Sequence, residues 1–318
     1  MKNIYLNIYK PNLINLKKAK KNIENNNVIG IPTETVYGLA ANAYSDKAVK
    51  KIFKLKKRPS FNPLIIHFKN LNSLKNDVVL SESFLKLYKA FCPGPITFIL
   101  NKKLKSKISK IATAKKNTVA VRIPKHHIAR RLLKNLKTPL AAPSANISSK
   151  LSPTSSSDVA EEFKNKIKFI LDGGRSKIGL ESTIIDLTAN PKILRPGFVT
   201  PKKISKVLKR KIKISKKIKK IKSPGQLKLH YFPGIPVKIN TKISKKNGAV
   251  IGFGKKFKVK KNHFNLSKNG NLIEAANNLY MTLRKIKNNG FKSIAVNKIP
   301  NVGIGLAIND RLKRASNK

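Results

Sequence analysis

Short apolar runs alternate with amphipathic stretches along the first two-thirds of the chain. Apolar runs bounded by Gly, Pro or polar clusters predict buried strands, whereas apolar residues at helical spacing predict helices that pack on one face. We expect strands at 28–32, 63–68, 96–100, 118–123, 140–142, 169–171 and 183–187. We expect helices at 46–57, with Asp46 as the N-cap, and at 81–91, 127–135 and 155–163. This alternation predicts an α/β architecture.

The pattern changes after residue 200. A helix is predicted at 201–210, and residues 209–222, nearly all Lys and Ile, suit a solvated helix or an extended basic linker. Residues 223–236 hold three Pro and two Gly, which predicts a constrained, non-helical linker. A second, smaller α/β pattern follows, with strands at 237–239, 249–253 and 293–296 and helices at 272–287 and 303–314. The expected organisation is a first domain at 1–205, a basic and Pro-rich linker at 206–236, and a C-terminal α/β domain at 237–318.

The length and the cysteine content agree with this division. At roughly 100–200 residues per domain, a chain of 318 residues with 40% hydrophobic residues suits two packed domains. The single cysteine, Cys92, excludes an internal disulfide and a Cys/His zinc cluster. No apolar run approaches the roughly 18 residues of a membrane-spanning helix, and the N-terminus lacks the features of a signal peptide. We therefore expect a cytoplasmic protein without a membrane partner.

The charge is strongly unbalanced. Lys and Arg number 70 against 13 Asp and Glu, which gives a formal net charge of +57, and residues 188–272 contain no acidic residue. Lys, Asn and Ile are all abundant and have A·T-rich codons, so a compositional bias of the genome is one explanation. Selection for a polyanionic partner such as tRNA or ATP is the other. In either case the chain is expected to attract polyanions weakly and nonspecifically at low salt.

Four segments carry polar residues inside otherwise apolar stretches. In the first, Thr33, Glu34 and Thr35 follow a predicted strand, where ligands collect in α/β folds. The same residues would also suit a capped turn between a strand and a helix. In the second, Lys56 and Arg58 precede a rigid Pro turn and suit phosphate oxygens. That segment continues through Asn62 into a strand that holds His67, and a histidine in a strand is often a core residue.

In the third segment, Arg122 lies in the apolar strand at 118–123, which predicts a buried anionic partner. The hydroxyls of Ser144 and Ser152 have small neighbours, so a ligand can approach the backbone there. The fourth segment adds Ser182 and Arg195.

Together these segments carry the motifs PTETVYGL, KxRP, NPL, PGPIT, TVAVRIP, APSAN, SPT, DGG, ESTI and LRPG in one continuous order. This order and spacing resemble the threonylcarbamoyl-AMP synthase family, the YrdC-like enzymes, over about residues 10–200. SPGQLKLHYFP and GIGLAINDRLKRA resemble the linker and tail of the two-domain members. The resemblance implies a YrdC-like twisted mixed sheet with helices, plus a smaller Rossmann-like α/β domain at the C-terminus.

The resemblance also implies an activity. Such an enzyme is a nucleotidyltransferase that makes L-threonylcarbamoyl-AMP and pyrophosphate from L-threonine, bicarbonate and ATP, with Mg²⁺ accompanying ATP. The product supplies a downstream tRNA threonylcarbamoyltransferase, which modifies the adenosine next to the anticodon. The chemistry depends on positioning, charge neutralisation and exclusion of water, because the threonine carbamate is short-lived in water.

Site residues carry over motif by motif. The resemblance implies L-threonine contacts from Thr33, His67, Arg122, Ala142 and Ser182. It implies ATP contacts from Lys56, Arg58, Asn62, Thr118, Ser144, Ser152, Arg195 and Tyr231. His67 is the candidate base for the threonine amine, and no protein side chain is expected to bind a metal. The linker at 223–236 is expected to cover the site as a lid, although its aromatic residues would also suit docking of the second domain.

Two other functions suit parts of the sequence. A non-catalytic RNA- or tRNA-binding module of the same fold agrees with the net charge, but RNA binding does not require buried hydroxyls beside His67 and Arg122. A carbamoyltransferase would need zinc-finger modules, which a single cysteine excludes.

Overall fold

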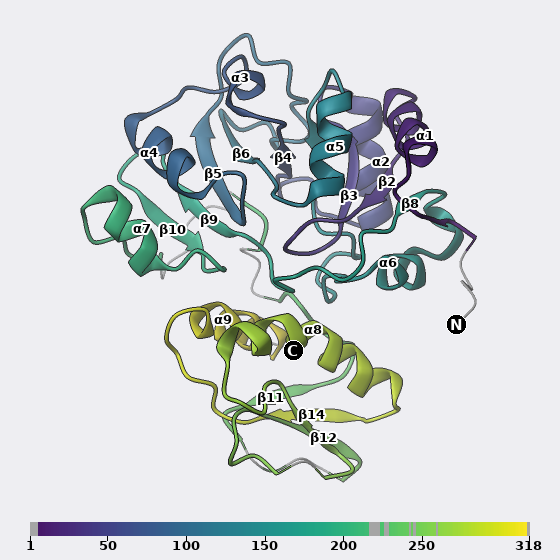
Figure 1. Ribbon diagram of the computed structural model, residues 1–318, viewed down its shortest axis with the longest axis vertical. Coiled ribbons are helices and arrows are strands. Elements are labelled where there is room, and N and C mark those ends of the chain that lie inside the picture. Colours follow the sequence, from purple (N-terminus) through teal and green to yellow (C-terminus); the bar gives the residue numbers. More distant parts are fainter. Residues whose placement is uncertain are drawn as a thin grey trace.

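The computed structural model describes residues 6–215, 223–225, 229–241, 243, 246–258 and 260–316, and its strands form two sheets (Figure 1). The larger sheet contains β1 (Ile8–Tyr9), β2 (Ile29–Ile31), β3 (Gly38–Asn42), β4 (Ile65–His67), β5 (Ile96–Asn101), β6 (Thr118–Arg122), β7 (Leu140–Ala141), β8 (Ile170–Leu171), β9 (Thr183–Asp186) and β10 (Lys192–Arg195). The smaller sheet contains β11 (Val237–Ile239), β12 (Gly248–Gly252), β13 (His263–Asn265) and β14 (Ser293–Val296).

Seven α-helices occur in the part of the described chain that forms the larger sheet, and two occur in the part that forms the smaller sheet. They are α1 (Leu13–Glu24), α2 (Asp46–Lys56), α3 (Leu71–Leu74), α4 (Glu82–Phe91), α5 (His127–Asn135), α6 (Ser156–Phe163), α7 (Pro201–Leu208), α8 (Leu272–Asn288) and α9 (Gly305–Ala315), with one 3₁₀ helix at Lys164–Lys166. Helices α8 and α9 lie between the smaller sheet and the larger lobe (Figure 1).

The larger sheet is mixed, with the order β1-β8-β2-β3-β7-β4-β6-β5-β9-β10. Strands β4 and β6 run parallel in the middle, and their register pairs His67 with Arg122 at their last residues. The smaller sheet has the order β11-β14-β12-β13 and is parallel throughout. The predicted fold class, a mixed α/β sheet with a smaller Rossmann-like domain, is confirmed. The predicted domain bounds, 1–205, 206–236 and 237–318, stay predictions.

Local chemistry explains where the helices begin. The prediction that Asp46 caps α2 is wrong. The extended residue Ser45 is the N-cap, and its hydroxyl accepts the Ala48 backbone N–H. Asp46 is instead the first helical residue, where a carboxylate still favours the helix dipole. In α8, the side chain of Asn271 accepts two backbone N–H groups in the same way.

The segment after β2 was expected either to bind a ligand or to form a capped turn into a helix, and the second of these expectations is wrong. Residues 32–37 lead into the antiparallel strand β3 and not into a helix, so Thr33 lies in a loop between two paired strands. The elements that were not predicted are β1, α1, β3, α3, β10, β13 and the 3₁₀ helix. The basic stretch is not helical at 209–215, whereas residues 216–222 of that stretch and 226–228 of the linker lie outside the described residues.

The apolar core continues across the two sheets. One cluster fills the larger lobe around Tyr37, Phe68, Phe84 and Phe98. A second cluster joins apolar side chains of the first domain to those of α8 and α9. Its members from the first domain include Val36, Leu151, Ile178 and Leu180. The two lobes are therefore packed through a shared apolar interface, and this interface borders the site described next.

Candidate active site

A cavity opens where the ends of β4, β6 and β10 meet the loop after β2 and the linker. The residues that line it are Thr33, Thr35, Val36, Tyr37, Gly38, Arg58, Ile65, His67, Arg122, Ala142, Pro143, Ser144, Glu181, Ser182, Arg195, Pro224 and His230. All five residues predicted for L-threonine lie in this lining. The cavity therefore collects side chains from segments up to about two hundred residues apart in the sequence.

Arg122 is paired inside the protein. Its Nη2 donates to Glu34 Oε1 at 2.6 Å, its Nη1 donates to Thr35 Oγ1 at 2.8 Å, and the residue is 4% exposed. Backbone N–H groups of Lys125 and His126 donate to the second carboxylate oxygen of Glu34. Burial would raise the pKa of Glu34, but Arg122 outweighs it and holds that pKa below its usual value. The predicted anionic partner of Arg122 is thus Glu34, which fixes the plane of the guanidinium.

His67 ends β4 beside Arg122 and is buried. Burial and, to a smaller extent, the charge of Arg122 lower the pKa of His67 well below its usual value, so the imidazole is neutral at neutral pH. Its Nδ1 has no hydrogen-bond partner within the described part of the chain. A neutral, buried imidazole at a cavity can accept a proton or a hydrogen bond from a ligand.

Lys56 and Arg58 approach the cavity from the end of α2. The Lys56 ammonium donates to the backbone carbonyls of Ser144, at 2.6 Å, and Asn146. Arg58 donates to the backbone carbonyls of Asn62 and Pro63 and to Asn62 Oδ1 at 2.7 Å. Burial lowers the pKa of both groups, and a nearby cation lowers it further, Arg58 in the case of Lys56 and Arg195 in the case of Arg58. Asn62 therefore orients Arg58.

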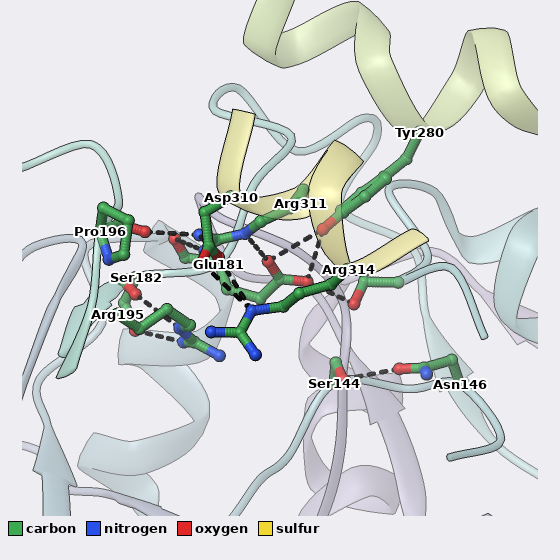
Figure 2. Close-up of polar contacts among 11 residues, drawn as sticks. Ser144, Asn146, Glu181, Ser182, Arg195, Pro196, Tyr280, Asp310, Arg311 and Arg314 are labelled. Carbon is green, nitrogen blue, oxygen red and sulfur yellow. Dashed lines mark hydrogen bonds and ion pairs between the residues drawn. The ribbon is translucent and has the colours of Figure 1, made fainter. Parts of the chain in front are cut away.

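Arg195 ends β10 on the opposite wall. Its Nε donates to the Ser182 carbonyl at 3.1 Å and its Nη2 to Ser182 Oγ at 3.3 Å (Figure 2). Ser182 Oγ also shares a hydrogen bond of 2.7 Å with Thr97 Oγ1. In the described chain, neither Arg58 nor Arg195 forms an ion pair with a carboxylate. Two buried cations thus face the cavity without a carboxylate at ion-pair distance, and Arg195 interacts with the charge of Glu181 only from farther away.

Glu181, the residue before Ser182, is buried and has several partners. Ser152 Oγ donates to its Oε1 at 2.5 Å, and Tyr280 of α8 and Arg311 of α9 donate to it from the second domain. Burial alone would raise the pKa of Glu181, but the charges of Arg311 and Arg195 and the Ser152 hydroxyl lower it to about 2. Glu181 is therefore ionised at neutral pH.

The linker lies against this site. Pro224 and His230 line the cavity, and Tyr231 is fully buried with a φ of 65°, a backbone conformation that a tyrosine rarely adopts. The Phe232 backbone N–H donates to the Ser149 carbonyl at 2.8 Å, which ties the linker to the loop after β7. Burial and the nearby Arg58 lower the pKa of His230 to about 3. The described part of the linker is thus part of the site wall.

Several buried polar atoms at the cavity have no partner in the residues that the structure describes. They are His67 Nδ1, Arg122 Nε, His230 Nδ1 and the hydroxyl of Tyr231. Buried polar groups are nearly always hydrogen-bonded in folded proteins, so a cluster of unpaired ones is a feature of ligand sites.

The predicted ATP residues are less closely grouped than the predicted threonine residues. Arg58, Ser144 and Arg195 line the cavity. Four others contact lining residues or lie beside them: Lys56, Asn62, Ser152 and Tyr231. Thr118 begins β6, at the opposite end of that strand from Arg122, and does not line the cavity. Which ligand each residue contacts stays a prediction.

Sequence reasoning missed four residues of this region: Glu34 as the partner of Arg122, Glu181, Tyr280 and Arg311. A signal existed for the two carboxylates. Only 13 residues of the chain are acidic. A glutamate that lies among apolar residues, as in PTETVYGL and ESTI, is expected to be buried and therefore to pair with a buried cation. Tyr280 and Arg311 belong to amphipathic helices, where periodicity does not reveal which partner a helix face meets.

Two further findings concern metals and membranes. Across the described ranges, no group of three or more His, Cys, Asp or Glu side chains could hold a metal ion. In the same ranges, no helix is long and apolar enough to cross a membrane.

Comparison with known proteins gives matches over almost the whole chain. A family model named for Sua5, YciO and YrdC and described as "Telomere recombination" matches residues 21–197, and one described as "Threonylcarbamoyl-AMP synthase, C-terminal domain" matches residues 199–317. The chain is 39% identical over 319 residues to the threonylcarbamoyl-AMP synthase of Pyrococcus abyssi, covering 92% of each chain. It is 36% identical to that of Bacillus subtilis, covering 95% of this chain and 92% of the relative.

A solved structure shows the same fold. The crystal structure of Pyrococcus abyssi Sua5 complexed with L-threonine superimposes with a TM-score of 0.88 at 36% identity, covering 98% of this chain and 97% of that one. The resemblance seen in the sequence motifs is thereby confirmed, and the arrangement of both lobes is shared with that structure.

Proposed function

The chain belongs to the threonylcarbamoyl-AMP synthase family, and we propose that it makes L-threonylcarbamoyl-AMP and pyrophosphate from L-threonine, bicarbonate and ATP. The observation that carries this proposal is the pair of buried guanidinium groups of Arg58 and Arg195. They face one cavity and, within the described chain, have no carboxylate partner. A buried cation is costly without an anion, so the cavity favours an anionic ligand such as a triphosphate.

On the amino-acid side, Arg122 and His67 form the binding wall. The guanidinium of Arg122 is held in one plane by Glu34 and Thr35, and its unpaired Nε is available to a ligand carboxylate. The relative from Pyrococcus abyssi was solved with L-threonine, which supports an amino acid at this wall. We assign Thr33, Ala142 and Ser182 to the same subsite.

The reaction begins with the threonine amine. Attack of the amine on bicarbonate-derived CO₂ forms a C–N bond and releases a proton, which leaves a carbamate. His67 is our candidate to accept that proton, because its imidazole is neutral and its Nδ1 is unpaired.

A carbamate oxygen then attacks the α-phosphorus of ATP in line with the departing pyrophosphate. An O–P bond forms and the bond to the β-phosphate breaks. Lys56, Arg58 and Arg195 would neutralise the phosphate oxygens, with Asn62, Ser144 and Ser152 as further contacts. Mg²⁺, carried by ATP, would add charge neutralisation. Thr118 stays a predicted contact whose position outside the cavity requires a ligand that extends along β6.

The linker supplies exclusion of water in this proposal. Pro224 and His230 already form part of the wall, and Tyr231 is buried behind them. Proton donors such as water cause the carbamate to lose CO₂, and water hydrolyses the mixed anhydride, so a closed wall protects both the intermediate and the product. The product would pass to a tRNA threonylcarbamoyltransferase in the cytoplasm for modification of the adenosine next to the anticodon.

The test is isotope exchange between pyrophosphate and ATP. Exchange should require both L-threonine and bicarbonate, and Arg122→Ala should abolish it, with Arg122→Lys recovering only part because an ammonium lacks the planar fork. Removal of one partner of a buried pair costs about 3–5 kcal/mol, so circular dichroism must show that each variant is folded. Exchange that is absent from the folded wild-type protein, together with salt-sensitive RNA binding, would indicate the RNA-binding module instead.

A further inference from the structure

The second domain reaches into the wall of the site through two side chains. The Tyr280 hydroxyl, from α8, lies 3.0 Å and 3.2 Å from the two carboxylate oxygens of Glu181, and Arg311 Nε, from α9, lies 3.1 Å from Oε2 (Figure 2). Both side chains are fully buried, and Glu181 itself lines the cavity. A carboxylate of the first domain is therefore held by donors of the second.

Arg311 contacts more than this carboxylate. Its Nη1 donates to the Pro196 carbonyl at 2.6 Å, its Nη2 lies 3.5 Å from the Glu181 carbonyl, and its guanidinium lies over the Tyr231 ring at 5.5 Å. The ring of Tyr280 also stacks on that of Tyr231, with centroids 5.7 Å apart. One guanidinium and one phenol thus bind three separate segments of the site wall.

Each of these segments carries or contacts a residue assigned to the nucleotide side. Glu181 accepts the hydroxyl of Ser152. Pro196 follows Arg195, and the linker contributes Tyr231 itself. An interaction that holds all three segments fixes the relative positions of a hydroxyl, a guanidinium and an aromatic ring around one ligand. Pre-organisation of this kind lowers the entropic cost of binding.

We propose that Tyr280 and Arg311 are positioning residues, through which the second domain sets the geometry of the nucleotide side of the active site. This inference rests on the proposed function, since it concerns how that site binds ATP. It gives the second domain a role in the reaction although none of its residues lines the cavity.

The charges around Glu181 make the inference testable by pH. The groups that face Glu181 are Arg311 from α9, Tyr280 from α8, Arg195 from β10, and His230 and Tyr231 from the linker, and Asp310 lies beside Arg311. Arg311 supplies the largest stabilisation of the Glu181 carboxylate. Without it, burial is opposed only by Arg195, Ser152 and His230, so the pKa of Glu181 rises and the carboxyl takes up a proton at a higher pH than in wild type.

The experiment uses the full chain with four substitutions. Arg311→Met removes the cation, and Arg311→Lys keeps the charge without the fork. Tyr280→Phe removes one hydroxyl and is mild enough to fold if Arg311→Met does not. Arg175→Met is the matched control, because exposed Arg175 donates to the Asn277 carbonyl at 2.7 Å and so also joins the domains, through a contact that does not involve Glu181.

We expect Tyr280→Phe and Arg311→Met to raise the KM for ATP by about 10- to 100-fold, the loss typical of a hydrogen bond to a charged group. The acid limb of the exchange activity should move to higher pH in Arg311→Met and to a smaller extent in Arg311→Lys. Arg175→Met should match wild type in both. Variants of Arg311 and Tyr280 that retain the wild-type KM and pH profile would overturn the inference.

Hydrogen–deuterium exchange separates this inference from the proposed function, because it needs no turnover. Peptides that contain Glu181, Pro196 and Tyr231 should exchange faster in Arg311→Met and Tyr280→Phe than in wild type or Arg175→Met. If wild type shows no pyrophosphate exchange but these peptides respond, the proposed function fails and the positioning role stands. If wild type is active but the peptides do not respond, the positioning role fails alone.

Discussion

At the scale of single residues, the charges around the cavity divide into two kinds. Arg122 and Arg311 have carboxylate partners, Glu34 and Glu181, whereas Arg58 and Arg195 have hydrogen bonds to neutral groups within the described chain. A paired guanidinium is held in a fixed plane without a ligand. Arg58 and Arg195 have no carboxylate within ion-pair distance in the described chain, so a bound anion can form the ion pairs that the protein itself does not supply.

His67 gives a pH prediction at this scale. Its pKa is lower in the folded state than in the unfolded chain, so below pH about 6.5 the unfolded chain binds a proton that the folded protein does not. Folding stability should therefore fall as the pH drops from about 7, by at most about 1.4 kcal/mol per pH unit from this group. Urea unfolding of wild type and His67→Asn at pH 7.5, 6.5 and 5.5 should show a shallower pH dependence in the variant.

The other buried histidine provides the control for this prediction. His230 also has a lowered pKa, and its contribution remains in both proteins, so the difference between them reports His67. Parallel pH dependences would mean that folded His67 takes up its proton as readily as a solvated histidine. The candidate base would then be charged in mildly acidic solution.

The sequence predicted part of this arrangement. An arginine in an apolar strand predicts a buried anion, because an unpaired charge there is too costly. Which carboxylate supplies it depends on how the loop after β2 folds over β6, which brings Glu34 to a residue 88 positions away. Sequence spacing carries no information about such a contact, so Glu34 and Glu181 were recognisable only as polar residues in apolar motifs.

At the scale of elements, the linker depends on a glycine that no other residue can replace without strain. Gly225 has a φ of 79°, and a Cβ atom there would lie 2.8 Å from Arg195 Cδ and 3.1 Å from the Tyr231 hydroxyl. Arg195 is buried and hydrogen-bonded to Ser182, so it cannot move away freely. The linker thus approaches the site wall at a distance that glycine alone allows.

Gly225→Ala should therefore lower pyrophosphate exchange by at least about tenfold, because Arg195 must move away from the added Cβ and its hydrogen bonds to Ser182 weaken. Gly290→Ala is the matched control, since Gly290 has a φ of 83° with nothing within 4 Å of its added Cβ. Both variants should lose about 1 kcal/mol of unfolding free energy from the left-handed backbone. Equal activity in the two variants would mean that the linker is not part of the functional wall.

Most elements could be predicted from the hydrophobic pattern, and the misses share a cause. The segment Gly38–Asn42 is a small-residue strand, GLAAN, whose alternation is too weak to distinguish from a turn. Helix α1 is Lys- and Asn-rich and contributes few buried residues, Leu16, Ala19 and Ile23. Its stability comes from packing on α5 and the neighbouring strands, which the local sequence does not encode.

At the scale of the whole molecule, the order of the two α/β units could be predicted, but their contact could not. Helices α8 and α9 each bury one face on the smaller sheet, as their periodicity indicates. They also present Tyr280 and Arg311 to the first domain. A polar or aromatic residue on the outer face of a predicted helix is normally assigned to solvent, so the interface became visible only with both lobes placed.

The formal net charge of +57 is spread over the whole molecule, and it leads to a prediction about tRNA binding. Lysines are exposed on both lobes, including Lys17, Lys18 and Lys21 near the N-terminus and Lys255, Lys256 and Lys258 after β12. If tRNA responds to the summed field and not to one built site, removal of either trio should weaken binding about equally.

The expected measurement is a series of tRNA affinities at increasing salt, for wild type and for each trio changed to Gln. Log affinity should fall linearly with log salt, and each lost phosphate contact should reduce the slope by roughly 1 because one fewer counterion is released. Both trios should therefore reduce the slope by similar amounts, of at most about 3.

Pyrophosphate exchange should be the same in all three proteins and should need no tRNA, because the cavity is lined by Arg58, Arg122 and Arg195 and by none of these lysines. A trio that alone removes binding would reveal a localised tRNA site, and exchange that requires tRNA would show that the charge takes part in the reaction itself.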